Sequence, residues 1–175
     1  TRAQQEYLLK IPQRGDSLLT ITNHILNFST IQSGRLEFES ADFSLRECVE
    51  GTLDLLAPKV AEKRLDLLYE IADNVPGMVR GYSTRLRQIL VNLLGNAVKF
   101  TAQGQVRFRL RYAREMARVE IIDSGPGMSD DELERVFEPF ARGSAAGNAA
   151  GAVIGGTGLG LTISKMLTDL MGGEM

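Results

Sequence analysis

Three features that would point to other classes of protein are scarce in this 175-residue sequence: cysteine, an excess of one charge, and long apolar runs. The single cysteine, Cys48, cannot form an internal disulfide, which fits a reducing compartment and predicts a small buried apolar side chain. The formal net charge of −2 gives no support to nucleic-acid binding through a basic surface. No apolar run approaches the roughly 20 residues that span a bilayer, and no signal peptide is visible. The remaining composition, 43% hydrophobic and 24% charged, is that of a soluble globular chain.

Residues 2–33 have the pattern of a helix that needs a partner helix. Seven positions follow alternating spacings of three and four residues, although three of them are polar or glycine: Leu8, Ile11, Gly15, Leu18, Thr22, Ile25 and Ser29. Further apolar residues widen this stripe beyond what one helix can bury alone. Pro12 and Gly15 predict a kink or break inside the helix, and Ser33-Gly34 predicts its end.

The rest of the chain alternates between helical and strand patterns. We expect helices at residues 44–63, 83–99, 129–137 and 157–171, and strands at residues 36–39, 65–71, 106–112 and 119–123. Capping boxes mark two of the helix starts, because Ser44 is followed by Glu47 and Ser129 by Glu132. Residues 141–157 are rich in glycine and alanine, and we expect a mobile lid there that orders on a ligand.

The helix expected at residues 83–99 carries an unusual polar face opposite its apolar stripe. Gln88, Asn92, Asn96 and Lys99 share this face, although asparagine is a poor helix former. Carboxamide oxygens are hard neutral ligands, suited to Mg²⁺ that phosphate oxygens already hold. Lys99, one turn after Asn96, can reach a phosphate as a point charge. The face therefore predicts a metal and phosphate site, and an ordinary solvated face is the alternative.

A second candidate segment, Asp123-Ser-Gly-Pro-Gly127, follows an apolar strand. Its glycines let the backbone approach a flat ligand, because no Cβ stands in the way. A carboxylate at the base of such a pocket accepts a hydrogen bond from the exocyclic amine of adenine, whereas guanine presents a carbonyl oxygen there. Hydrogen bonds to a charged group contribute about 1.5–3 kcal/mol, so the choice of base would rest largely on Asp123. Taken alone, the segment also fits an ordinary hairpin turn.

The third segment is a glycine run, Gly155-Gly-Thr-Gly-Leu-Gly160, that leads into an apolar helix. Backbone amides at a helix N-terminus attract anions, and the helix dipole adds to the attraction. The run is weak evidence alone, since it lacks the Gly-Lys-Ser/Thr of a Walker loop and follows no strand as a Rossmann turn would. The order and spacing of the three segments together predict an ATP site.

These segments resemble the catalytic, ATP-binding region of bacterial sensor histidine kinases, within the superfamily of gyrase, heat-shock-chaperone and mismatch-repair ATPases. Residues 92–101 look like the family's N box, 123–127 like its adenine-binding glycine box, 137–140 like its phenylalanine box and 156–161 like its second glycine box. Leu18 to Glu39 is similar to the second helix of the dimerisation and histidine-phosphotransfer domain with its linker. The resemblance covers essentially the whole chain. It implies an α+β fold, a two-layer α/β sandwich with helices on one face of a mixed sheet, preceded by a helix of a dimeric four-helix bundle.

The resemblance also implies roles for individual residues. Asn96, helped by Asn92, would hold Mg²⁺, and Asp123 would accept a hydrogen bond from the adenine amine. Asn92, Lys99 and Arg142 would be catalytic, with Lys99 at the phosphates and Arg142 as a lid arginine that reaches the γ-phosphate. The other residues expected to contact the nucleotide are Gly125, Gly127, Met128, Phe137, Phe140, Gly156, Thr157, Gly158, Leu159, Gly160 and Leu161.

One position favours phosphoryl transfer over hydrolysis. The ATP-hydrolysing relatives in this superfamily carry a glutamate one helical turn before the metal-binding asparagine, and Asn92 stands at that position. An amide is no general base at neutral pH, so transfer to another acceptor is expected. A plain ATPase of the same superfamily is the disfavoured alternative.

Two departures from the family pattern limit the expected function. The phosphoacceptor motif, a histidine followed by Glu-Leu-Arg-Thr-Pro or similar, is missing, and we expect the sole histidine, His24, to be structural or solvent-facing. The family also continues past the final Gly-Gly with two more strands. We therefore expect residues 1–34 to form a partial dimerisation and phosphotransfer helix, and residues 35–175 a C-terminally truncated ATP-binding domain.

The sequence thus predicts the ATP-binding catalytic region of a two-component sensor histidine kinase, in a cytoplasmic domain. It would transfer the γ-phosphoryl group to a histidine outside this chain, and thence to an aspartate of a response regulator or receiver domain. We expect a homodimer through the N-terminal helices, no nucleic-acid partner, and a membrane connection only through regions absent from this sequence. The alternative is a signalling and dimerisation module of a degenerate kinase that binds nucleotide weakly or not at all.

Overall fold

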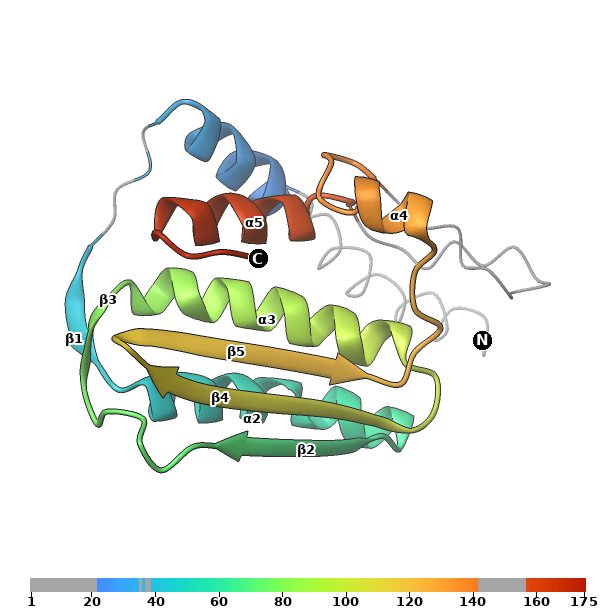
Figure 1. Ribbon diagram of the computed structural model, residues 1–175. Helices are drawn as coiled ribbons and strands as arrows, with labels where there is room; N and C mark the ends of the chain where they lie inside the picture. Colours follow the sequence, from blue (N-terminus) through green and yellow to red (C-terminus); the bar gives the residue numbers. More distant parts are fainter. Residues whose placement is uncertain (1–21, 35, 37–38, 142–156) are drawn as a thin grey trace, which may run out of the picture.

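The computed structural model describes residues 22–34, 36, 39–141 and 157–175 (Figure 1). Residues 22–32 are helical. The elements that follow are β1 (Ala41–Phe43), α2 (Leu45–Lys63), β2 (Asp66–Ile71), β3 (Val79–Gly81), α3 (Ser83–Phe100), β4 (Gln105–Ala113), β5 (Met116–Asp123), α4 (Asp130–Arg135) and α5 (Gly160–Leu170). Within this described part, every helix is too short or too polar to cross a membrane.

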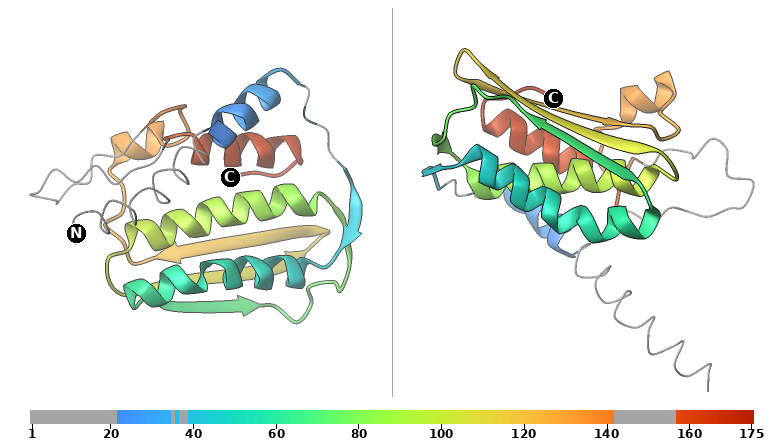
Figure 2. Two further views of the ribbon diagram at one scale, coloured as in Figure 1. Left: turned by 180° about the vertical axis from the view of Figure 1, so that it is seen from behind. Right: turned by 90° about the horizontal axis from the view of Figure 1, so that it is seen from below.

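A mixed three-stranded sheet is the centre of the fold. Its order is β2-β4-β5, with β2 parallel to β4 and β4 antiparallel to β5, while β1 and β3 form a separate antiparallel pair. Seen from behind, α2 and α3 lie across one face of this sheet (Figure 2). The expected α+β class, with helices covering one face of a mixed sheet, is confirmed.

The main core fills the space between the sheet and the two helices that cover it. Alternation along β4 buries Val106, Phe108 and Leu110, because successive side chains of a strand point to opposite faces. The helical period of α3 brings Leu90 and Leu94 against them. This packing fixes the orientation of α3 and therefore the direction of its polar face.

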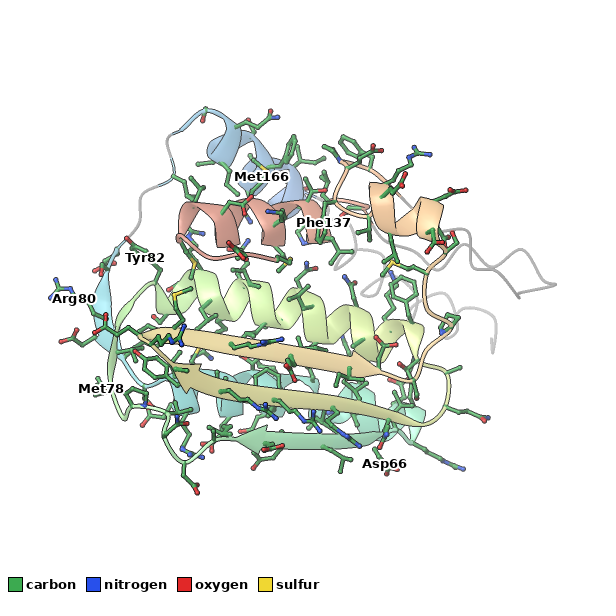
Figure 3. All side chains as sticks on the ribbon, viewed as in Figure 1. Asp66, Met78, Arg80, Tyr82, Phe137 and Met166 are labelled. Atoms are coloured by element: carbon green, nitrogen blue, oxygen red, sulfur yellow. The ribbon has the colours of Figure 1, made fainter. Side chains whose placement is uncertain are left out.

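A second apolar cluster joins the first helix to the end of the chain. Ile31 packs with Ile163 and Leu167 of α5, and α3 contributes Ile89. Figure 3 shows Met166 between α5 and the helix of residues 22–32. Gly34, with φ +66°, ends that first helix at the predicted residue. The helix of residues 22–32 thus lies directly against α5, whose first turn begins at the glycine run.

Two predictions about the elements require correction, and one strand was missed. Leu36 and Glu39 lie outside any strand, and the strand of this region is β1 instead. β3 went unpredicted, because a strand of three residues is too short to show a periodic pattern. The last helix begins at Gly160 and not at residue 157, since Gly158 has a left-handed φ of +69°. The predicted helix over residues 2–21 and the lid over residues 142–156 lie outside the described residues.

Candidate nucleotide-binding site

The polar face of α3 forms one wall of the candidate site. Asn92, Asn96 and Lys99 are all partly buried on it, and α5 packs against α3. The Asn92 amide nitrogen Nδ2 donates a hydrogen bond to the hydroxyl of Ser164, at 2.7 Å, and Ser164 is 1% exposed. Asn92 therefore bridges the two helices, and is not on a solvated face.

The Asp123 turn is tied to the segment between α3 and β4 by a small set of hydrogen bonds. The Ser124 hydroxyl accepts from the Gln105 amide at 2.9 Å and donates to the Gln103 carbonyl at 3.2 Å. The Gly125 amide donates to Asp123 Oδ1 at 2.8 Å. A Cβ at Gly125 would lie 2.7 Å from that same oxygen and 3.3 Å from the Phe100 carbonyl oxygen, so a side chain there would displace the Asp123 carboxylate. These contacts place an exposed carboxylate beside the C-terminus of α3.

Lys63 of α2 closes the C-terminus of α3. Its ammonium donates to the carbonyl oxygens of Val98, Lys99 and Thr101 at 2.8, 2.6 and 3.0 Å. A cation at this end of a helix satisfies carbonyl groups that have no partner within the helix and opposes the negative end of the dipole. Lys63 therefore anchors the end of α3 to α2. The Asp123 turn is hydrogen-bonded to the segment that follows α3, so this anchor also helps to position Asp123.

A backbone contact brings the phenylalanine box to the glycine run. The Phe140 amide donates to the Gly158 carbonyl at 2.9 Å, and Phe140 itself has a φ of +64°. A Cβ at Gly158 would lie 2.7 Å from the Phe140 Cα and carbonyl carbon. Phe137 lies between α4 and the first turn of α5 (Figure 3). The two residues that flank the segment 142–156, Ala141 and Thr157, are therefore held close together.

Thr157 connects the glycine run to the first helix. Its hydroxyl oxygen accepts a hydrogen bond from the Leu159 amide at 3.2 Å and lies 3.0 Å from His24 Nδ1. Burial lowers the pKa of His24 below its ordinary value, because the charged imidazolium loses hydration there. His24 is thus a partly buried contact residue, as its structural interpretation predicted.

The structure brings the three predicted segments around one region. Asn92 meets the start of α5, the Asp123 turn meets the end of α3, and Phe140 meets Gly158. Gly127 has a φ of +72° with open space at its Cβ position, and Met128 and Phe140 are 51% and 61% exposed. Leu159 is buried, and Gly160 and Leu161 are partly buried in the first turn of α5. Arg142 and Gly156 lie outside the described residues.

Two residues beside this region were missed in the sequence. Ser164 and Lys63 contact α3 from other helices, and each contact joins residues more than 30 positions apart. A serine among the apolar residues of this helix, four residues after Gly160, was the available signal for Ser164. Lys63 resembled any other lysine in the last turn of a helix.

The described residues lack a metal centre built from acidic or soft ligands. No cluster of three or more His, Cys, Asp or Glu side chains in this part of the chain could hold a metal ion. Asn92 and Asn96 of α3 offer hard oxygen donors, and Asn92 contacts α5. Such neutral donors suit a cation that arrives with anionic ligands of its own, as Mg²⁺ does with nucleotide phosphates.

Similar proteins are sensor histidine kinases. GacS of Pseudomonas protegens, a sensor histidine kinase, is 41% identical over 180 residues, which cover 100% of this chain and 19% of that protein. Full-length ShkA, solved in complex with AMPPNP, superposes with a TM-score of 0.81 at 30% identity, covering 98% of this chain and 35% of that one. Histidine kinase ThkA, solved with the response regulator TrrA, gives a TM-score of 0.70 at 25% identity, covering 95% of this chain and 44% of that one.

The chain thus spans about a fifth of the length of the curated relatives that it matches. Residues 81–175, from β3 through α5, match the model of one family, and they include every segment of the candidate site. The predicted resemblance is confirmed: the chain belongs to the family of histidine kinase-, DNA gyrase B- and HSP90-like ATPases.

Proposed function

We propose that this chain binds Mg²⁺–ATP and donates its γ-phosphoryl group to a histidine of a sensor histidine kinase. The observation that carries the proposal is the meeting of three segments around α3. The Asn92 carboxamide contacts α5, the Asp123 turn is hydrogen-bonded through Ser124 to the loop that follows α3, and Gly158 pairs with Phe140. These are the three kinds of group that a nucleotide requires: carboxamide oxygens for the cation, a carboxylate for the base, and backbone amides at a helix start for the phosphates.

Adenine recognition rests on Asp123 in this proposal. Its carboxylate is held by the Gly125 amide and remains exposed at the end of β5. It accepts a hydrogen bond from the exocyclic amine of adenine and would face a carbonyl oxygen in guanine. Because Gly127 has open space at its Cβ position, a planar base can approach the backbone there.

The carboxamides of Asn92 and Asn96 hold Mg²⁺ together with phosphate oxygens, and Lys99 meets the phosphates. The cation neutralises charge on the transferring phosphoryl group when it is bound. Asn92 offers no general base, so water is not activated at its position. Arg142 reaches the γ-phosphate in this proposal, and Gly156, Gly158 and Gly160 line the phosphate path.

The acceptor histidine lies outside this chain. His24 is followed by Ile-Leu-Asn and not by the phosphoacceptor motif, and its Nδ1 is held 3.0 Å from the Thr157 hydroxyl oxygen. A response regulator or receiver domain takes the phosphoryl group next, by analogy with the ThkA complex with TrrA. The helices before residue 34 pair in a homodimer, and the domain works in the cytoplasm.

Phosphate release separates this proposal from a plain ATPase. The chain is incubated with Mg²⁺ and γ-labelled ATP, alone and with the dimerisation domain of a related kinase that carries the acceptor histidine. We expect label on the added domain and no steady release of phosphate in its absence. Multiple turnovers of phosphate release by the chain alone would instead establish an ATPase.

A further inference from the structure

The Asn92 side chain packs against the first turns of α5. The Asn92 amide Nδ2 donates to Ser164 Oγ at 2.7 Å, across a gap of 72 positions in the sequence. A Cβ added at Gly160 would clash with Asn92 Oδ1 and would lie 3.0 Å from Nδ2. The carboxamide therefore fills the space beside Gly160, with its oxygen toward the first turn of α5.

The glycines of the run differ in what they make room for. At Gly158 an added Cβ would strike the backbone of Phe140, whereas at Gly160 it would strike the side chain of Asn92. Gly160 lies within α5 at an ordinary helical conformation, where alanine would otherwise be preferred. A side chain at residue 160 is therefore excluded by Asn92 and not by backbone conformation.

An asparagine side chain can present either its oxygen or its amide to a ligand, and a cation is bound only by the oxygen. In this structure the Ser164 hydroxyl accepts from Nδ2, and Oδ1 of the same carboxamide lies beside Gly160. Ser164 is 1% exposed, so water does not replace it easily. Groups that orient a metal ligand in this way affect metal affinity although they never touch the metal.

We propose that Ser164 is a positioning residue for the cation that accompanies the nucleotide. Through its hydrogen bond to Nδ2, it holds Asn92 Oδ1 toward the first turn of α5, and Gly160 supplies the space that this orientation needs. The inference rests on the proposed function, because it assigns Asn92 Oδ1 to the magnesium of Mg²⁺–ATP.

Calorimetric titration of Ser164→Ala with ATP, in Mg²⁺ and separately in EDTA, tests this assignment. We expect the affinity in Mg²⁺ to fall about tenfold, the usual effect of removing such a supporting group, while the affinity in EDTA stays within twofold of wild type. Thr162→Val is the matched control, because Thr162 is 6% exposed on the same helix and its hydroxyl has no hydrogen-bond partner among the described residues. The control should match wild type under both conditions.

Two further variants examine the space beside Gly160. Gly160→Ala should lower the affinity in Mg²⁺ and also the stability, because the new methyl group displaces the carboxamide. Gly160→Ala combined with Asn92→Ala should regain the stability and leave the affinity in Mg²⁺ low. Recovery of that affinity in the double variant would overturn the assignment of Asn92.

The NMR resonances of the Asn92 side-chain amide give a readout that needs no nucleotide. We expect its side-chain NH₂ resonances to shift in Ser164→Ala and to stay in place in Thr162→Val. Unchanged resonances, unchanged affinity in Mg²⁺, or an equal loss in Mg²⁺ and in EDTA would each overturn the inference. Failure of the wild-type chain to bind ATP would overturn the proposed function instead, and the resonances would still report on the hydrogen bond to Ser164.

Discussion

Replacing Lys63 with methionine should destabilise the fold by about 2–3 kcal/mol. Methionine keeps the apolar stem of the side chain and removes the ammonium that donates to the carbonyls of Val98, Lys99 and Thr101. Hydrogen bonds from a charged donor contribute about 1.5–3 kcal/mol each. We take the lower value for all three because the lysine is exposed, and subtract about 2 kcal/mol for its lost rotamer entropy.

Urea denaturation followed by circular dichroism measures this loss. The control is Lys59→Met, which changes an exposed lysine one turn earlier on α2. We expect the control to change the free energy of unfolding by less than about 0.5 kcal/mol. If Lys63→Met costs no more than the control, the ammonium does not anchor the end of α3, and the account of how the Asp123 turn is positioned is wrong.

Two further predictions concern the glycine run and its contact with the first helix. Gly158→Ala should cost about 3 kcal/mol in urea denaturation, because a left-handed alanine costs about 1–2 kcal/mol and its Cβ would also meet the Phe140 backbone. Gly127→Ala has a similar φ and open space, so only the conformational cost applies there, and equal losses in the two variants would contradict the Phe140 contact. Burial lowers the pKa of the His24 imidazole in the folded chain. As the pH falls, the unfolded chain therefore binds a proton on this imidazole before the folded chain does, and the free energy of unfolding drops from about pH 7 downward. His24→Gln should lose less stability than wild type between pH 7.5 and pH 5.5, and an identical loss in both proteins would contradict the burial of the imidazole.

Local chemistry in the sequence was enough to predict the elements that surround the site. The hydroxyls of Ser44 and Ser129 accept the hydrogen bonds expected at the starts of α2 and α4, and Glu132 completes its capping box. The apolar stripe of α3 and the alternation of β4 were also readable, because both are periodic over many residues. These predictions depend on neighbours only a few positions apart.

Contacts between distant residues were not predictable in this way. The short strands β1 and β3 form because they pair with each other, and neither has a periodic pattern of its own. Ser164 meets Asn92 only because α5 packs along α3, and His24 meets Thr157 across 133 positions. The candidate site was therefore predictable as three motifs, and the side chains that support it were visible only in the folded chain.

Calorimetric titration with ATP and GTP, in Mg²⁺ and in EDTA, tests the central claim most directly when wild type is compared with Asp123→Asn. We expect micromolar binding of ATP by the wild type, weaker binding of GTP, and loss of ATP binding in the variant, because the amide places a donor where the adenine amine must donate. A folded wild-type chain that binds neither nucleotide, or an Asp123→Asn variant that binds ATP as well as wild type does, would contradict the account.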